Sequence, residues 1–370
     1  MFVFIVLAVF CVFFTWLQQI GAIENGLKIS YFLIFLFLSL RYDFGNDYMP
    51  YLDGYLELQT LDRSELYFRG NEVGWLFLNY LYKSIFGDLG FHIMLTGMAA
   101  FTCFVLYRFT VKYISPEYYA LSIALLLLEP NNILVISSAM RQSIAVGIFL
   151  LNIDSLIEKR YVQYTAGILL ASLFHSSALF FLVLVLVNFV NWKIHIPFIF
   201  FTFALFLVFI SNADEFFKLI NLLLESQEVV YYSDYTETGF EKPKMGFGFA
   251  LNIFMYLIVL IINRKSYDDM DRYSIIKMTI FALFLVSISI AVPLASRLSF
   301  YIFPCVVCAY TYTLNKIKEM DDESSVIYSN FLTLFIGAYF IYQNVIFWQS
   351  KVYSPYFLEY KSIISSPLLN

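Results

Sequence analysis

Three ionisable residues stand close together directly after the second long apolar run of this chain, residues 28–40. Arg41, Asp43 and Asp47 are interleaved with glycine, asparagine and tyrosine. Charged groups at the edge of a hydrocarbon-soluble segment cost free energy, so they commonly have a functional role. Guanidinium groups bind phosphate oxygens and carboxylates exchange protons, so these residue types predict chemistry on an anionic substrate.

The composition identifies the elements that must position these residues. Hydrophobic residues make up 61% of the 370 residues and charged residues 14%, whereas soluble domains have about 45–50% and about 25%. Apolar runs recur at lengths of about 15–22 residues, which match the roughly 20 residues that a helix needs to cross a bilayer. Backbone in lipid must satisfy its own hydrogen bonds, so each run is expected to be helical. The sequence predicts an all-α, polytopic integral membrane protein with one transmembrane domain over residues 1–370.

Hydropathy predicts about twelve transmembrane helices. They are expected at residues 2–20, 28–41, 90–109, 117–129, 141–157, 161–174, 176–191, 196–211, 247–263, 275–293, 297–314 and 325–347. The stretch 71–87 is amphipathic and is interrupted by Asn79 and Lys83, so we expect a helix lying at the membrane interface. The first run lacks a preceding basic segment and a small-residue cleavage site, so it is expected to remain in the protein.

Basic residues in short loops set the expected orientation, because such loops face the cytoplasm. They gather at 159–160, at 264–265 and at Lys316 with Lys318. Residues 42–89 then form an extracytoplasmic loop with the interfacial helix, and residues 212–246 form a second outer loop that is a candidate lid. Acidic residues near the basic loops leave the reversed orientation as the alternative.

Further polar residues reach the outer face in this topology. Glu72 starts the interfacial helix, and Arg141 and Arg297 each begin a span. His175 interrupts the apolar stretch 161–192, which has basic residues at both ends, so a hairpin of two short helices turning at His175 is expected. We predict that these residues converge with Arg41 and Asp47 in one site.

The expected site could bind and process a lipid-borne anion. Arg41, Arg141 and Arg297 are suited to the head group of a polyprenyl diphosphate, although each arginine could instead extend to the interface or cap a helix. Four groups are candidates for a general base: Asp43, Asp47, Glu72 and His175. Asp43 and Asp47 could alternatively stabilise a turn. The four cysteines lie inside apolar runs and offer no complete metal site.

The ordered set of these motifs resembles the EpsG-like, Wzy-type polysaccharide polymerases. The set comprises residues 41–48 with Tyr51, Glu72, Arg141 and Gln142 with Ala145, residues 171–178, and Arg297 with Tyr301. The resemblance implies a GT-C-like, metal-independent glycosyltransferase that needs no cofactor. Such an enzyme joins undecaprenyl-diphosphate-linked oligosaccharide repeats into a surface polysaccharide, such as O-antigen of lipopolysaccharide or capsule, on the outer side of the bacterial inner membrane.

The resemblance also implies roles for the matched residues. His175, Asp47 or Glu72 would act as the base, and Arg141, Arg297 and Arg41 would hold the diphosphate. Substrate contacts are expected from Asp43, Tyr48, Gln142 and Tyr301. The expected partners are polyprenyl-diphosphate-linked oligosaccharides, the lipid bilayer and a chain-length regulator, but not nucleic acid.

Other functions would use similar features. A lipid-linked oligosaccharide flippase also needs many helices and buried cations, but its charges should line a central cavity, whereas the middles of these runs are nearly charge-free. An O-antigen ligase differs only in its acceptor. A membrane acyltransferase would share a histidine and arginines on one face. A nucleotide-sugar enzyme would need a cytoplasmic domain.

Overall fold

The computed structural model describes residues 1–58, 72–129, 131–135, 138–189, 195–211, 247–265, 270–291, 297–320, 323–349 and 354–365. The chain divides into two compact units. The first contains residues 1–190 and 337–370, and the second contains residues 191–336.

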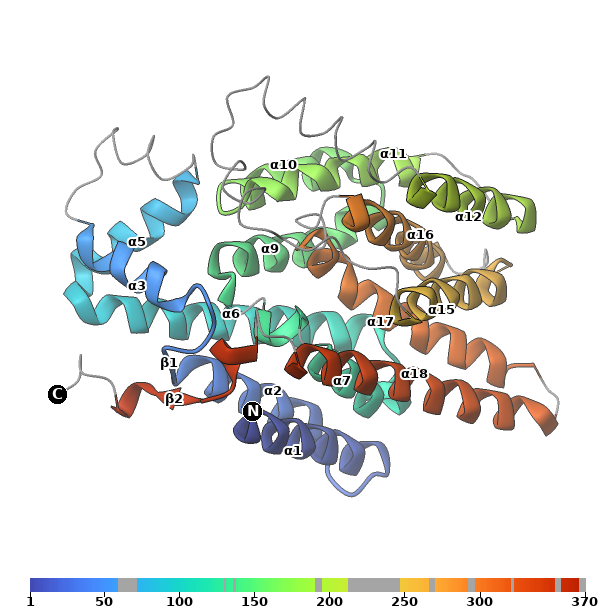
Figure 1. Cartoon of the computed structure of the whole chain (residues 1–370), viewed down its shortest axis with the longest axis horizontal. Coiled ribbons are helices and arrows are strands. Elements are labelled where there is room, and N and C mark those ends of the chain that lie inside the picture. The colour runs from blue at the N-terminus through green and yellow to red at the C-terminus, as the bar shows by residue number, and fades with distance from the viewer. Residues whose placement is uncertain are drawn as a thin grey trace. The chain divides into compact units, whose positions relative to one another are not determined.

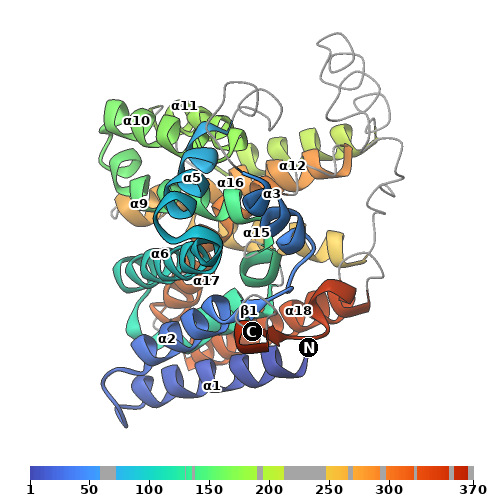
Figure 2. The ribbon, with the colours of Figure 1, turned by 90° about the vertical axis from the view of Figure 1, so that its left-hand side faces the viewer.

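The first unit begins with an antiparallel hairpin of α1 (Phe2–Gln19) and α2 (Gly26–Ser39). The two helices approach closely at Gly26, where a Cβ atom would overlap the carbonyl oxygen of Phe14. On its other side α2 packs against α6 (Gly90–Tyr113), and α1 also contacts α7 (Tyr119–Leu128), which follows η2 (Pro116–Tyr118). Figures 1 and 2 both show α1 and α2 side by side.

Two helices between α2 and α6 belong to the predicted outer loop. They are α3 (Tyr48–Glu57) and α5 (Val73–Phe86), and α5 joins α6 through η1 (Gly87–Leu89). The turn between α5 and α6 uses Gly87 at φ +60°, a conformation that glycine adopts readily. The predicted helix at 71–87 is therefore present as α5, which packs against α6. Its position at the membrane interface stays a prediction.

The chain continues beyond α7 with further helical segments of this unit. η3 (Asn131–Val135) precedes α9 (Met140–Ile157), which is followed by α10 (Tyr161–Ser172). The helices α6, α9 and α10 are stacked in that order (Figures 1 and 2). The predicted hairpin at His175 is confirmed, because η4 (Ser176–Leu182) turns back onto α10 before α11 (Val183–Phe189). The returning segment starts as a 3₁₀-helix, which the sequence did not indicate.

The C-terminal tail returns to the loop that follows α2. Its η6 (Ser354–Phe357) precedes β2 (Lys361–Ser362), which pairs antiparallel with β1 (Arg41–Tyr42) before η7 (Ile363–Ser365). Aromatic rings support the junction, since Phe44 packs against both Phe357 and Tyr360. This strand pair was not predicted, because two-residue strands leave no periodic pattern in a sequence.

The second unit is a helical cluster with its own core. Its helices are α12 (Ile196–Ser211), α15 (Phe247–Asn263), α16 (Met270–Ala291) and α17 (Ser299–Lys318). Buried Ile199, Leu260 and Ile276 join α12, α15 and α16. The last long helix, α18 (Glu323–Gln349), begins in this unit, and its residues from 337 onward belong to the first.

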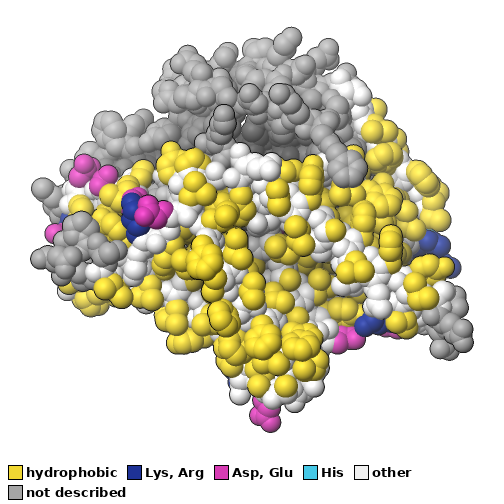
Figure 3. Space-filling view, turned by 60° about the horizontal axis from the view of Figure 1, so that its bottom comes forward, with side chains coloured by type: hydrophobic (Ala, Val, Ile, Leu, Met, Phe, Trp, Pro, Cys, Tyr) yellow, Lys and Arg dark blue, Asp and Glu magenta, His cyan; other side chains and the backbone are white. Residues whose placement is uncertain are grey.

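The outer surface is suited to a bilayer. Hydrophobic side chains dominate the described surface in Figure 3, and Phe2, Val9 and Trp16 are among the exposed apolar residues of α1. Within the described residues, four helical stretches are long and apolar enough to span a membrane: Phe2–Gln19, Val73–Tyr113, Met140–Ile157 and Ser324–Gln349. Shorter apolar helices accompany them. The prediction of an all-α membrane protein is confirmed, whereas the count of about twelve spans stays a prediction.

Candidate functional site

The carboxylate of Glu72 is the centre of a buried polar cluster in the first unit. Glu72 immediately precedes α5 and is only 5% exposed. Its Oε2 lies 2.5 Å from Nη1 of Arg141, and its Oε1 lies 2.7 Å from Nδ1 of His175. Three predicted site residues from three separate segments therefore meet, because the carboxylate of Glu72 contacts both Arg141 and His175.

Close backbone contact between α5 and the end of α10 fixes this meeting point. The N–H of Gly74 donates to the carbonyl of Leu173 at 2.8 Å. A Cβ atom on Gly74 would lie only 2.9 Å from that same oxygen. Any side chain at position 74 would push α5 away from α10, and Glu72 away from His175.

Tyr51 and Trp75 complete the surroundings of Arg141. The Nε of Arg141 donates to the hydroxyl of Tyr51 at 2.9 Å, and its guanidinium also lies over the Tyr51 ring, 5.5 Å from the centroid. The Trp75 ring packs edge-on against Tyr51 at 5.1 Å. Burial raises the pKa of Tyr51, so the phenol remains neutral and can accept this hydrogen bond. Tyr51 was among the motif residues but not among the predicted site residues; its position one turn after Asp47 was the available signal.

A hydrophobic core holds the helices that carry these groups. Buried side chains of α3, α6 and the start of α9 pack together, including Leu52, Phe91 and Met140. Met140 directly precedes Arg141, and Leu52 directly follows Tyr51. Packing therefore fixes the two backbones from which the hydrogen-bonded pair projects.

The loop containing Asp47 is tied to the segment before α9. The N–H of Asp47 donates to Oγ of Ser138 at 3.0 Å, and this hydroxyl donates in turn to Oδ1 of Asn46 at 3.0 Å. Gly45 has φ +105°, and a Cβ atom there would lie 2.7 Å from Ser138 Oγ. Asp47 therefore lies beside the segment that leads into Arg141, but its carboxylate accepts from Asn46. Ser138 and Asn46 were not predicted as part of the site.

Arg41 and Asp43 instead attach the loop to the C-terminal tail. Arg41 is 3% exposed, donates to the carbonyl of Leu38 at 2.7 Å and lies near Tyr48 and Tyr360. Burial lowers its pKa to about 10. Asp43 forms an exposed pair with Lys361 at 2.8 Å. The predicted roles of Arg41 in diphosphate binding and of Asp43 in substrate contact stay predictions.

Three predicted substrate contacts are buried. Tyr48 and Tyr301 are completely enclosed, and Gln142 is 2% exposed. Tyr48 packs edge-on against Phe91 in the core of α3 and α6. The family resemblance indicated these residues as substrate contacts, but the sequence did not indicate which face of a helix each would occupy. Their predicted contacts with substrate stay predictions.

The geometry of the first unit does not test the predictions for Arg297 and for the candidate lid. Arg297 belongs to the second unit and directly follows residues outside the described ranges, so its convergence with Arg141 stays a prediction. The candidate lid at 212–246 lies outside the described residues. Within the described part of the chain, no group of three His, Cys, Asp or Glu side chains could hold a metal ion.

The chemical capacity of the cluster follows from its hydrogen bonds. With Nδ1 of His175 facing a carboxylate, the proton is expected on Nδ1, which leaves Nε2 with a free electron pair. A histidine oriented in this way can accept a proton from a substrate, and the carboxylate then stabilises the resulting imidazolium. Arg141 is one-third exposed, so part of its guanidinium remains accessible to an anion.

Fold and site together define a helical membrane protein with a carboxylate held between a guanidinium and an imidazole. The sequence model of the EpsG family matches residues 27–362, and the chain belongs to this family. The matched range includes Glu72, Arg141 and His175. Membership indicates a role in polysaccharide biosynthesis as a glycosyltransferase-like polymerase that acts on lipid-linked substrates in a bilayer. No curated protein and no solved structure matches the chain.

Proposed function

We propose that this protein polymerises undecaprenyl-diphosphate-linked oligosaccharide repeats into a surface polysaccharide, by metal-independent glycosyl transfer on the outer side of the bacterial inner membrane. The observation that carries the proposal is the bridging of His175 and Arg141 by Glu72. One group that can take a proton and one that can neutralise a phosphate are thereby held side by side. Family membership supplies the class of substrate.

The proposed reaction has two lipid-linked partners. A hydroxyl of the acceptor repeat attacks the anomeric carbon of the donor glycan, and its proton passes to Nε2 of His175. The bond between the anomeric carbon and the diphosphate oxygen breaks, and the lipid diphosphate leaves with the electron pair. Arg141, joined by Arg297 in this proposal, stabilises the charge that develops on the diphosphate.

The geometry favours different roles for the candidate bases. Glu72 is buried and both of its oxygens face basic groups, so we assign it the role of orienting His175 and Arg141. His175 is about one-fifth exposed and remains the proposed base. Asp47 lies farther along the same loop with its carboxylate on Asn46, so we assign it to holding the loop.

Several parts of the proposal rest on the sequence. The basic loops at 159–160 and 264–265 favour a cytoplasmic position for those turns, which puts the Glu72 cluster on the outer face. In this arrangement residues 212–246 would close over the two glycans as a lid. A chain-length regulator remains the proposed protein partner.

Glycan profiling of a strain that carries His175→Ala tests the function. We expect the polymer ladder to collapse to single repeat units while the variant still inserts into the membrane at normal levels. His195→Ala is the matched control, because His195 is an exposed histidine of the second unit and its loss should leave the ladder unchanged. A normal ladder in His175→Ala would contradict the proposal. Loss of all surface glycan with accumulation of lipid-linked repeats would instead indicate a flippase or a ligase.

A further inference from the structure

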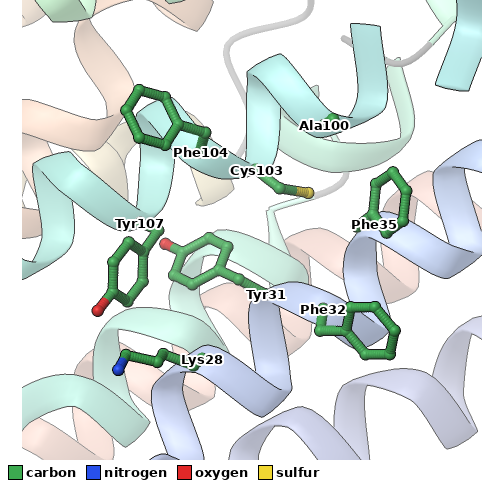
Figure 4. A pocket seen from close by; sticks show the side chains of 8 residues that line it. All are labelled: Lys28, Tyr31, Phe32, Phe35, Ala100, Cys103, Phe104 and Tyr107. Atoms are coloured by element: carbon green, nitrogen blue, oxygen red, sulfur yellow. The ribbon is translucent and has the colours of Figure 1, made fainter. Parts of the chain in front are cut away.

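An open groove of ≈ 320 Å³ lies between α2 and α6 (Figure 4). Phe32 and Phe35 from α2 and Phe104 from α6 form its sides. Phe32 and Phe104 are each 57% exposed, so the groove opens outward between aromatic rings. An aromatic groove between two apolar helices is suited to bind a hydrocarbon chain.

One end of the groove differs from the rest. Lys28 and Tyr107 stand together there, whereas Phe35 and Ala100 stand at the other end (Figure 4). Lys28 is exposed, and within the described residues no carboxylate pairs with it. The groove therefore offers a positive charge at the end of an otherwise apolar surface.

Hydrogen bonding and ring packing stabilise this end. The hydroxyl of Tyr31 bonds to Oγ1 of Thr110 at 2.8 Å, which joins α2 to α6 beneath the groove. The Tyr107 ring packs edge-on against Tyr31 at 5.8 Å. The Tyr107 ring beside Lys28 is therefore held in place, and the Tyr107 hydroxyl can donate a hydrogen bond to an oxygen of a bound head group.

The shape and charge match an amphiphile with an anionic head. From Lys28 to Phe35 the groove follows α2 for about 10 Å, at about 1.5 Å per residue, which is long enough for a substantial part of an acyl chain. A phosphate at Lys28 would place the chain along the rings. Basic sites between transmembrane helices on the cytoplasmic side bind acidic lipid head groups in this way.

The position of the groove separates it from the Glu72 cluster. Lys28 lies near the start of α2, whereas Asp47 and its loop follow the end of that helix at Ser39, which lies about 16 Å farther along at about 1.5 Å per residue. In the orientation predicted from the basic loops, Lys28 is at the cytoplasmic boundary. A lipid diphosphate engaged at the Glu72 cluster therefore cannot place its head group here.

We propose that this groove binds an anionic glycerophospholipid of the inner leaflet, with its phosphate on Lys28 and an acyl chain between Phe32 and Phe104. The site is distinct from the polymerase site. Lipid binding in the groove needs neither the family assignment nor the Glu72 cluster, and it shares with the proposed function only the membrane orientation predicted from the basic loops.

Native mass spectrometry of the full-length protein in mild detergent tests the proposal. The probes are dioleoyl phosphatidylglycerol, dioleoyl phosphatidylcholine and undecaprenyl phosphate. We expect wild-type protein to retain phosphatidylglycerol about fivefold over phosphatidylcholine, the ratio that one lysine near an acidic lipid provides. Lys28→Gln should remove this preference, and Ala100→Trp should weaken retention by filling the apolar end. Lys159→Gln, which removes an exposed lysine from a loop, is the matched control.

Three results would overturn the proposal. Equal retention of phosphatidylglycerol and phosphatidylcholine by the wild-type protein would mean that only the ordinary lipid annulus is present. An unchanged preference in Lys28→Gln would place the head group elsewhere. Stronger retention of undecaprenyl phosphate than of phosphatidylglycerol at Lys28 would identify a polyprenyl lipid as the occupant. Each variant changes an exposed residue, so folding should be preserved.

Discussion

Two carboxylates near opposite ends of α9 are surrounded in similar ways. Glu72 meets Arg141 and His175 near the start of the helix, and Tyr51 lies beside them. Near the end of α9, Asp154 lies 2.7 Å from Nζ of Lys112 and 3.8 Å from Nη2 of Arg108. The hydroxyl of Tyr113 also donates to Asp154. Each centre therefore combines one carboxylate, two basic groups and one phenol.

The difference between the two centres lies in the type of base. The basic partners of Asp154 are a lysine and an arginine of α6, so we assign that centre the role of bracing α6 against α9. The Glu72 centre contains a histidine, whose imidazole nitrogen can accept a proton from a substrate. The same architecture can therefore hold helices together at one boundary and move a proton at the other, and matched substitutions can separate these roles.

Replacement of the two carboxylates should give the largest contrast. In Glu72→Gln we expect a loss of polymerisation of about 10²–10⁴-fold, the range that a positioned general base contributes, because His175 loses its orienting charge. In Asp154→Asn we expect near-normal polymerisation with unfolding easier by about 1–3 kcal/mol, since charged hydrogen bonds are lost. Polymerisation assays on reconstituted protein and thermal unfolding in detergent measure the two effects. Equal losses of activity in both variants would contradict the assignment of catalysis to the Glu72 centre and of helix bracing to the Asp154 centre.

Displacement of α5 should have the next largest effect. In Gly74→Ala the new methyl group meets the carbonyl of Leu173, so Glu72 should shift relative to His175. Misplacement by about 1 Å can cost about 10²-fold in rate. Gly337→Ala is the matched control, because a Cβ atom there meets nothing within 4 Å. The two variants are compared at equal membrane levels, and full activity in Gly74→Ala would show that the close approach does not matter for the chemistry.

Loss of the Tyr51 hydroxyl should have the smallest effect on polymerisation. Tyr51→Phe removes one hydrogen bond to Arg141 but keeps the ring, so the expected change is a few-fold fall in polymerisation, corresponding to about 1 kcal/mol. Tyr113→Phe removes the matching hydrogen bond to Asp154 and should leave the polymerisation rate unchanged. Steady-state rates on the reconstituted protein distinguish the two. A fall in rate for Tyr113→Phe alone would reverse the assignment of the two centres.

The positions of the helices and the turn at His175 could be predicted from the sequence. Hydropathy located the helices because lipid forces each apolar run into a helix, and the basic residues at both ends of 161–192 required the turn at His175. This topology was sufficient to bring Glu72, Arg141 and His175 to one boundary.

Side-chain direction could not be predicted in the same way. Arg41 follows an apolar run and Arg141 begins one, so in sequence both have the appearance of boundary residues. Tertiary contacts enclose Arg41 and leave Arg141 shared between a carboxylate and a phenol. The pairing of Arg41 with Ser362 joins residues that are far apart in the chain and belong to strands too short to leave a pattern.

A double-mutant cycle on Glu72 and His175 tests the central claim most directly. The rate of polymerisation would be measured for His175→Ala, Glu72→Gln and the double variant, at matched levels of folded protein. If Glu72 acts through His175, the double variant should be no slower than His175→Ala alone, because residues that work as a unit are strongly non-additive. If the two losses multiply, the carboxylate and the imidazole act independently and the proposed pair is not the catalytic unit.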